Sequence, residues 1–437
     1  MKKVVALLGL IAVLGSWQTA KAKTLEEVLK EKGVITEEDF KEVQKSSPVK
    51  YKLGEGFNFT SADGKFSSSI GAAFQVRYTL MDVDDVNNSP AKQAQDSSKL
   101  ELKRIKLLFN GYAYSPDLTY KMSINFANII GNTTTGSGLL EETWMNYRLL
   151  DAVQFRFGQD KVPFARQFMT PSTAQQFVDQ SIVTAAFAPG YDTGITVLGK
   201  VAGGLFNYCI AGLGGVGQNT FRGTTDNAFV ARITADPFGY VKYSEADLDN
   251  SIKPLWSVGG SFYRNTVNQT AGAFESNNLG FAKSTGWYGI GTPLMTAAQK
   301  FNTTEAIDFN TYGVDTVFKW RGLSVTGEYF RGYAEGQTTT HKLNAEGFYG
   351  QAGYFILPKK VELAYRYSYL DPNQSTTKDH WTENTAAVSW YINNHNLKLQ
   401  ADYTNVHKQS NIASVNSGPN AKASDDQQVR FQAQILF

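Results

Sequence analysis

The sequence predicts an all-β fold, an antiparallel transmembrane β-barrel of about 16 strands preceded by a short N-terminal helical segment. Three observations lead to this prediction. Polar and apolar residues alternate in segments of about ten residues, these segments recur from about residue 66 to the C-terminus, and the connections between them are alternately short and long. A strand of about ten residues, tilted by about 45°, crosses the hydrocarbon layer of a membrane. Because every backbone polar group in lipid must be paired, such a sheet has to close into a barrel.

The composition of the 437-residue chain agrees with this fold and excludes several other classes of protein. Mean hydropathy is −0.30, so the chain is not a bundle of membrane helices, which requires repeated apolar runs of about 18 residues. Aromatic residues make up 13%, which argues against intrinsic disorder. The net charge of +2 provides no extended basic surface for nucleic acid. The single cysteine, Cys209, excludes an internal disulfide and any multi-cysteine metal site.

Residues 1–22 have the features of an export signal peptide. Two lysines precede an apolar stretch over residues 4–15, and the sequence Ala-Lys-Ala at 20–22 is a small-residue cleavage site. The apolar stretch is too short to span a bilayer as a helix, and the alternative is a buried helix of the folded protein. Cleavage after Ala22 would remove three of the 42 basic residues and none of the 40 acidic ones, so we expect an exported chain close to neutrality.

Residues 23–50 are charged and helical in pattern, unlike the rest of the chain. Thr24 and Glu27 fit a capping box, and Gly33 separates this first helix from a second one that can begin near Thr36. We expect a periplasmic helical segment here, which is either a coiled arm or a simple tether to the barrel domain of residues 51–437.

The alternation of side chains is clearest over residues 70–80, 118–127 and 428–437, where apolar and polar residues occupy opposite faces of the predicted strands. The apolar face would contact lipid and the polar face a water-filled lumen. Aromatic residues cluster at strand ends, as interfacial girdles do, for example at Trp390 and Tyr391. The alternative is a soluble β-sandwich in which one face of each sheet is exposed to solvent. Its strands would be shorter, about 5–6 residues each.

The connections between strands indicate which end of the barrel is which. Short turns, such as Ser115 to Asp117 and Leu357 to Lys359, alternate with long polar stretches such as 265–309. Short periplasmic turns and long external loops are typical of outer-membrane barrels. An even number of strands then places both ends of the barrel domain in the periplasm.

One connection, over about residues 161–191, is long but apolar, and it contains Phe164, Phe168, Phe177 and Phe187. A loop of this composition is expected to pack against other parts of a protein rather than extend into water. We expect it to fold into the barrel and constrict the passage. The alternative is an external loop that covers a neighbouring subunit of a trimer.

Several stretches resemble the phosphate-selective porin O/P family. They are Phe157–Phe164, with the pattern G-Q-x-K-x-P-F, then Ala188–Ile195, Val388–Asn393 and the terminal Phe437 after an alternating strand. The resemblance implies an outer-membrane porin of about 16 strands, a homotrimer whose third external loop folds inward. It also implies anion selectivity, which in some members of the family is for phosphate or polyphosphate.

Alternation also assigns charged side chains to the lumen. The predicted inward basic residues are Arg77, Arg104, Lys106, Lys121, Arg148, Arg156, Arg232, Lys319, Arg366, Lys398 and Arg430, and the inward connection adds Lys161 and Arg166. The predicted inward acids are Glu142, Asp160, Asp315, Glu328, Glu362 and Asp402. Rings of Arg or Lys lower the electrostatic barrier to anions in a narrow passage. The alternative is that these residues pair with the lumen acids and hold the inward connection, and a one-residue bulge would reverse an assignment.

No motif indicates catalysis, a cofactor or a bound metal. The glycine-rich stretch at 212–217 matches G-x-G-x-x-G but is not followed by a helical pattern, and neither G-x-S-x-G nor H-E-x-x-H occurs. We therefore predict a protein that is not an enzyme and needs no cofactor.

The predicted function is an outer-membrane porin of a Gram-negative bacterium that admits small hydrophilic solutes by passive diffusion, with a preference for anions and with phosphate as one candidate. The expected partners are outer-membrane lipid, small anions or other small hydrophilic solutes, and further copies of the chain in a homotrimer, but no nucleic acid. The alternatives are a non-selective general porin, a structural or adhesive surface barrel with a closed pore, and a barrel enzyme such as a lipase or protease.

Overall fold

The computed structural model describes residues 29–38, 49–84, 96–128, 139–270, 273–275, 301–302, 304–410 and 422–437. The chain divides into two compact units, residues 1–50 and residues 51–437. In the first unit, the predicted export signal lies outside the described residues, whereas the predicted helical segment is partly described and includes a helical turn at residues 29–31. No helix in the described part of the chain has the length and hydrophobicity needed to cross a membrane.

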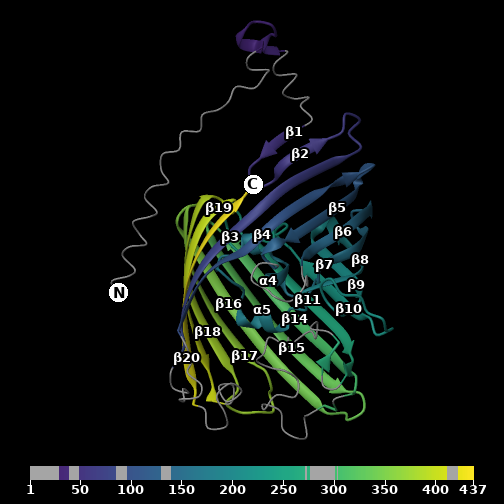
Figure 1. Ribbon diagram of the computed structural model, residues 1–437, viewed down its shortest axis with the longest axis vertical. Helices are drawn as coiled ribbons and strands as arrows, with labels where there is room; N and C mark the ends of the chain where they lie inside the picture. Colours follow the sequence, from purple (N-terminus) through teal and green to yellow (C-terminus); the bar gives the residue numbers. More distant parts are fainter. Residues whose placement is uncertain are drawn as a thin grey trace. The chain divides into compact units, whose positions relative to one another are not determined.

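The second unit is a closed antiparallel β-barrel of 16 strands, which confirms the predicted fold class. The barrel strands are β3 (Ser67–Asp82), β4 (Ser97–Ala113), β5 (Ser115–Asn125), β6 (Leu140–Leu150), β7 (Val153–Lys161), β8 (Tyr191–Val201), β9 (Phe206–Leu213), β10 (Ala228–Ala235), β11 (Leu255–Val267), β14 (Ile307–Trp320), β15 (Leu323–Gly336), β16 (Lys342–Leu357), β17 (Val361–Asp371), β18 (Trp381–Asn393), β19 (Leu397–Lys408) and β20 (Ser424–Leu436). Each strand pairs with its neighbour in the chain, and β20 pairs with β3 over ten residues from Asp82–Gln427 to Ala73–Leu436, which closes the ring (Figure 1).

Four short strands lie outside this ring. They are β1 (Val49–Lys52), β2 (Gly56–Thr60), which pairs with the first residues of β3, and the small hairpin of β12 (Gln269–Thr270) and β13 (Ala273–Phe274). The C-terminal residue is held at the same end of the barrel as β2, because Phe437 and Ala72 exchange two backbone hydrogen bonds and the rings of Phe437 and Phe74 stack at 5.7 Å.

Alternation along the strands separates a lipid-facing surface from an interior, as the sequence predicts. On β14, the inward side chains of Thr311, Asp315 and Lys319 are buried, whereas the outward Tyr312 and Val314 are 51% and 56% exposed. An apolar side chain exposed on the outside of a barrel is stable because it faces the acyl chains of the membrane.

The two ends of the barrel have different connections. At one end, here called the turn end, six pairs of strands are joined by short turns, for example β4 to β5 and β14 to β15. The C-terminus lies at the same end (Figure 1). At the other end, here called the loop end, the connections are long. One connection at the turn end is an exception that the sequence did not predict. It joins β10 to β11 through residues 236–254, here called the inner turn, in which Asp236, Val241 and residues 245–247 are buried.

A second buried connection, residues 162–190 between β7 and β8, is here called the inner segment. It contains α4 (Arg166–Met169), η4 (Ser172–Ala174) and α5 (Ile182–Phe187), and Figure 1 shows α4 and α5 inside the ring of strands. Two further 3₁₀ turns, η3 (Phe126–Asn128) and η5 (Ala202–Gly204), lie at strand ends.

The hydrophobic core of the protein lies inside the barrel, around the inner segment. Phe164 and Phe187 are fully buried, and both rings lie 5.5 Å from the ring of Phe330 on β15. Tyr263 on β11 and Phe309 on β14 also face inward in the same cluster. The inward side chains of β9 to β17 include apolar residues because they pack against the inner segment, which fills this side of the barrel. Space remains along the opposite wall.

Candidate pore constriction

Carboxylates on the barrel wall bind the backbone of the inner segment. The side chain of Glu328 on β15 accepts hydrogen bonds from the backbone N–H groups of Arg166 at 2.6 Å and Gln167 at 2.7 Å. Asp402 on β19 accepts a bond from the backbone N–H of Val178 at 3.0 Å. Because ionised carboxylates accept strong hydrogen bonds, these acids both fix the inner segment and are satisfied by it. Their carboxylate oxygens therefore face the inner segment.

The inner turn supplies a third such carboxylate. Glu245 accepts bonds from the backbone N–H of Gln176 at 2.7 Å and the side-chain amide of Gln167 at 3.0 Å, and its own N–H donates to Ala174 at 3.0 Å. Arg166 donates to the carbonyl of Val241 at 3.2 Å, and its guanidinium group lies over the ring of Tyr243, also in the inner turn. The inner turn therefore supports the inner segment from the turn end of the barrel.

Replacing Glu245 with alanine is expected to loosen the inner segment. The change leaves the Gln176 N–H without its acceptor in a buried site, which costs about 1–3 kcal/mol. We expect a thermal unfolding midpoint that is a few degrees lower and noisier single-channel current. Asp249→Ala is the control, because Asp249 lies in the same turn but is exposed and paired with Lys242, which is exposed too. Equal midpoints for the two variants would contradict this support role.

Several predicted pore-lining basic residues also hold the inner segment. Arg77 binds Asp179 at 2.7 Å and the carbonyl of Val178 at 2.6 Å. Lys398 donates to the carbonyl of Gln175 at 2.8 Å. Arg232 binds the Phe164 carbonyl and Arg366 lies over the Phe177 ring, both in the inner segment. Arg232, Arg366 and Arg430 also pair with acids of the barrel wall, namely Asp315, Glu383 and Asp402. These basic side chains therefore lie among acids and carbonyl groups of the inner segment. This arrangement agrees with the alternative given above, in which the basic residues pair with lumen acids and hold the inward connection.

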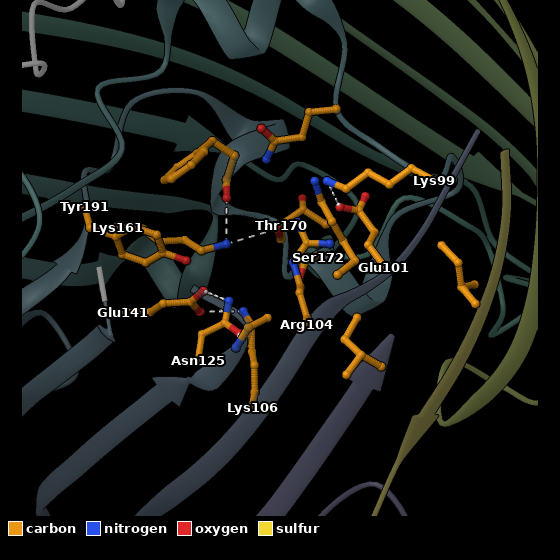
Figure 2. Close-up of a pocket in the computed structure, with 16 residues that line it drawn as sticks. Lys99, Glu101, Arg104, Lys106, Asn125, Glu141, Lys161, Thr170, Ser172 and Tyr191 are labelled. Atoms are coloured by element: carbon orange, nitrogen blue, oxygen red, sulfur yellow. Dashed lines mark hydrogen bonds and ion pairs between the residues drawn. The ribbon is translucent and has the colours of Figure 1, made fainter. Parts of the chain in front are cut away.

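The opposite wall of the barrel encloses a cavity of about 700 Å³, here called the first cavity. It lies between β4, β6, β8 and the inner segment, and its charged lining residues are Lys99, Glu101, Lys103, Arg104, Lys106, Glu141 and Lys161 (Figure 2). Three of the five basic residues are paired with acids, Lys99 with Glu101 at 2.6 Å, Lys106 with Glu141 at 2.5 Å and, more loosely, Lys103 with Asp179 at 3.9 Å. The basic residues outnumber the acids, so the first cavity is electropositive.

A β-bulge explains why the first cavity has more charges than the alternation predicts. The register between β3 and β4 shifts between Gln75 and Val76, so that Arg104 pairs with Gln75 but Leu102 pairs with Val76. Lys103 therefore lies in the bulge, and both Lys103 and Arg104 reach the cavity. Beyond the bulge, Lys99 and Glu101 also line it. The sequence analysis missed these three residues, Lys99, Glu101 and Lys103, because no residue type in β4 marks the extra residue.

A smaller cavity of about 290 Å³, here called the second cavity, lies toward the turn end. Its charged lining residues are Glu142, Arg156, Asp160, Lys161, Arg166, Lys200, Arg232 and Asp236. Arg156 is paired with Asp160 and lies over the ring of Trp144 at 4.1 Å. Lys121 is paired with Glu142 at 2.6 Å. The inner turn forms part of the lining through Tyr240, Val241 and Tyr243.

Lys161 at the end of β7 borders both cavities. Its ammonium group donates to the carbonyls of Phe168 at 2.7 Å and Thr170 at 3.1 Å, as Figure 2 shows. The carbonyls come from the inner segment, so the lysine both anchors that segment and places a positive charge where the two cavities meet.

One predicted pore-lining residue lies apart from the others. Arg148, at the turn end of β6, is about half exposed and pairs with Asp117 at 2.6 Å and Asp151 at 3.3 Å. It lines neither cavity. The structure thus brings Arg104, Lys106 and Lys161 together at the first cavity and leaves Arg148 outside the constriction.

A family model for phosphate-selective porin O and P matches residues 74–252 and 255–437. The chain belongs to this porin family. It is an outer-membrane porin, and its family and fold are those of a channel rather than an enzyme. A protein of Aquifex aeolicus (strain VF5), described only as uncharacterized, is 22% identical over 439 residues, which cover 91% of this porin and 93% of that protein.

Solved structures of other porins share the fold. The anion-selective porin from Comamonas acidovorans is 10% identical, with 85% of this porin and 100% of that chain covered and a TM-score of 0.53. A trimer form of OmpT from Vibrio cholerae is 9% identical, with 84% and 99% covered and a TM-score of 0.51. At these identities the likeness establishes the barrel architecture, and selectivity has to be argued from the side chains of this porin.

Proposed function

We propose that this porin conducts small hydrophilic anions across the outer membrane, and that inorganic phosphate is one of them. The passage runs along the β3–β8 wall through the first cavity, past Lys161 and into the second cavity. The chain assembles as a homotrimer after export by an N-terminal signal peptide, with the turn end in the periplasm. The trimer form of OmpT and the anion-selective Comamonas porin, which share the fold, support these proposals by likeness.

The observation that carries the anion preference is the separation of charge across the constriction. Acids on the β15–β19 wall accept hydrogen bonds from the inner segment, as Glu328 and Asp402 do. The first cavity, on the other side of the inner segment, has five basic and two acidic lining residues. An anion there replaces part of its hydration with contacts to Lys and Arg, whereas a cation is repelled. Because three of the lysines are paired with acids, the attraction is moderate, which lets the anion leave.

A second candidate, a non-selective general porin, would follow if the lysine and arginine charges were fully compensated. The pairs Lys106–Glu141 and Arg156–Asp160 are the observations in its favour. The two candidates differ in permeability rather than in architecture. A surface barrel with a closed pore has no specific observation in its favour in the described part of the chain.

The test of the proposed function is the reversal potential of the reconstituted porin in a planar bilayer under a salt gradient. With potassium chloride, we expect a potential of the sign that chloride flux produces. Exchanging chloride for phosphate then compares the two anions in one protein. A potential near zero would favour the general porin, and a potential of the opposite sign would contradict anion conduction.

A further inference from the structure

The connection between β17 and β18, residues 371–380 at the loop end, has an unusual order of side chains. Seven of its ten residues carry a side-chain oxygen, and five of these, Asp371, Asn373, Ser375, Thr377 and Asp379, fall at every second position. Calcium-binding loops place their oxygen ligands in this way, at the first, third, fifth, seventh and ninth positions. The glycine at the sixth position and the glutamate at the twelfth position of an EF-hand are absent, so the resemblance is confined to the spacing of the oxygens.

Asp379 is a buried carboxylate without a full set of partners. The residue is 2% exposed, and its Oδ2 atom is buried with no hydrogen-bond partner among the described residues. A buried carboxylate is costly unless a hydrogen bond, an opposite charge or a metal ion compensates it. Its Oδ2 atom is therefore a candidate ligand for a cation.

A second carboxylate, that of Asp371, lies beside the first. The backbone N–H of Asn373 donates to Asp371 at 3.1 Å and also stabilises the carboxylate of Asp379. The negative charge of Asp371 acts on the buried carboxylate of Asp379. Glu346 pairs with Asp371 across β16 and β17 and adds further negative charge nearby. Two adjacent carboxylates in a protected loop are the arrangement that a divalent cation stabilises.

We infer that the β17–β18 loop binds a divalent cation of the calcium type through the carboxylates of Asp371 and Asp379. The described residues contain no group of three or more His, Cys, Asp or Glu side chains suited to a metal. The other ligands are therefore neutral oxygens of the loop and water. A site of oxygens without nitrogen or sulfur suits calcium and not zinc. With two charged ligands, we expect a dissociation constant on the order of 10⁻⁴ to 10⁻³ M, as in extracellular calcium modules.

The site would strengthen the loop end of the barrel. Gln374 in the same loop donates its N–H to the carbonyl of Asn344 at 2.9 Å, and its side chain accepts from Arg331 at 3.3 Å. Leu370 and Trp381, which flank the loop, pack against the core around the inner segment. An ion between Asp371 and Asp379 would therefore hold together the strand ends that border the inner segment.

The experiment is a calcium titration of the full-length porin in detergent by isothermal calorimetry. Asp379→Asn and Asp371→Asn keep the size of the side chain and remove the charge. Each is expected to weaken binding by about tenfold or more. Asp425→Asn is the matched control, because Asp425 is an exposed carboxylate at the same end of the barrel that is paired with His407. Its affinity for calcium should equal that of the unmodified porin.

Two further measurements distinguish the loss of the calcium site from misfolding of a variant. Terbium can replace calcium, and Trp381, two residues from Asp379, should sensitise its luminescence in the unmodified porin and in Asp425→Asn but not in Asp379→Asn. Millimolar calcium should also raise the thermal midpoint of the unmodified porin by mass action. Unchanged affinity in both Asp379→Asn and Asp371→Asn, or the absence of any calcium effect on the unmodified porin, would overturn the inference. Anion conductance is not part of this readout, so the inference and the proposed function can fail separately.

Discussion

Replacing Lys99 and Lys103 together with glutamate is expected to reverse the selectivity of the porin from anions to cations. The change converts a first cavity with five basic and two acidic lining residues into one where acids are in excess. A unit charge about 4 Å from an ion is worth about 1 kcal/mol in bulk water and more in a narrow passage. Since about 1.4 kcal/mol is a tenfold change, the anion-to-cation permeability ratio should fall by roughly tenfold or more.

These two lysines are suitable because neither is essential for holding the inner segment. Among the described residues, Lys99 pairs with Glu101 alone, and Lys103 lies 3.9 Å from Asp179, which keeps its closer pair with Arg77. The measurement is the reversal potential in a potassium chloride gradient, whose sign should change.

The matched control for this prediction is Lys342→Glu combined with Lys360→Glu. It makes the same change in net charge at two exposed positions outside both cavities. The control should leave the reversal potential almost unchanged, because exposed charges are screened within about 10 Å at 0.1 M salt. If control and test variants shifted the potential equally, the selectivity would reside in the overall charge of the barrel and not in the first cavity.

Glu328→Ala is expected to release the inner segment and raise the single-channel conductance at least roughly twofold. The substitution removes the acceptor for the backbone N–H groups of Arg166 and Gln167 and for the hydroxyl of Tyr349. Each donor left unpaired in a buried site costs about 1–3 kcal/mol. The loss is therefore large enough to detach α4 from the wall. Conductance and the largest neutral sugar that enters porin-containing liposomes should both increase.

Two further variants on β15 serve as controls for this second prediction. Glu335→Ala changes an exposed carboxylate of β15 that is paired with the exposed Lys342, and the conductance of this variant should match that of the unmodified porin. Glu328→Gln keeps an acceptor for one of the two N–H groups and should give an intermediate conductance. If Glu328→Ala conducted like Glu335→Ala, the inner segment would not depend on Glu328 for its position.

The sequence predicted the barrel because the membrane imposes a simple rule on it. Side chains in a lipid-spanning strand have to alternate, and the pattern of β14, with buried Asp315 and exposed Val314, follows that rule. The apolar composition of residues 161–191 likewise predicted a packed connection, although its partners across the barrel depend on contacts between distant parts of the chain.

Two features of the constriction could not be read from the sequence. The bulge that brings both Lys103 and Arg104 to the first cavity depends on the register of β3 against β4, and register is a property of paired strands rather than of one strand. The inner turn was also missed, because residues 236–254 are polar enough to resemble an exposed connection. Their burial becomes evident only when Glu245 is seen to bind the inner segment.

The most direct test of the central claim is to locate the anion. We expect crystals of the porin soaked in bromide to show anomalous scattering in the first cavity, beside Lys103 and Arg104. A parallel soak in rubidium should show no cation there. Bromide found only at the outer surface of the barrel, or rubidium within the first cavity, would contradict the claim that this cavity selects anions.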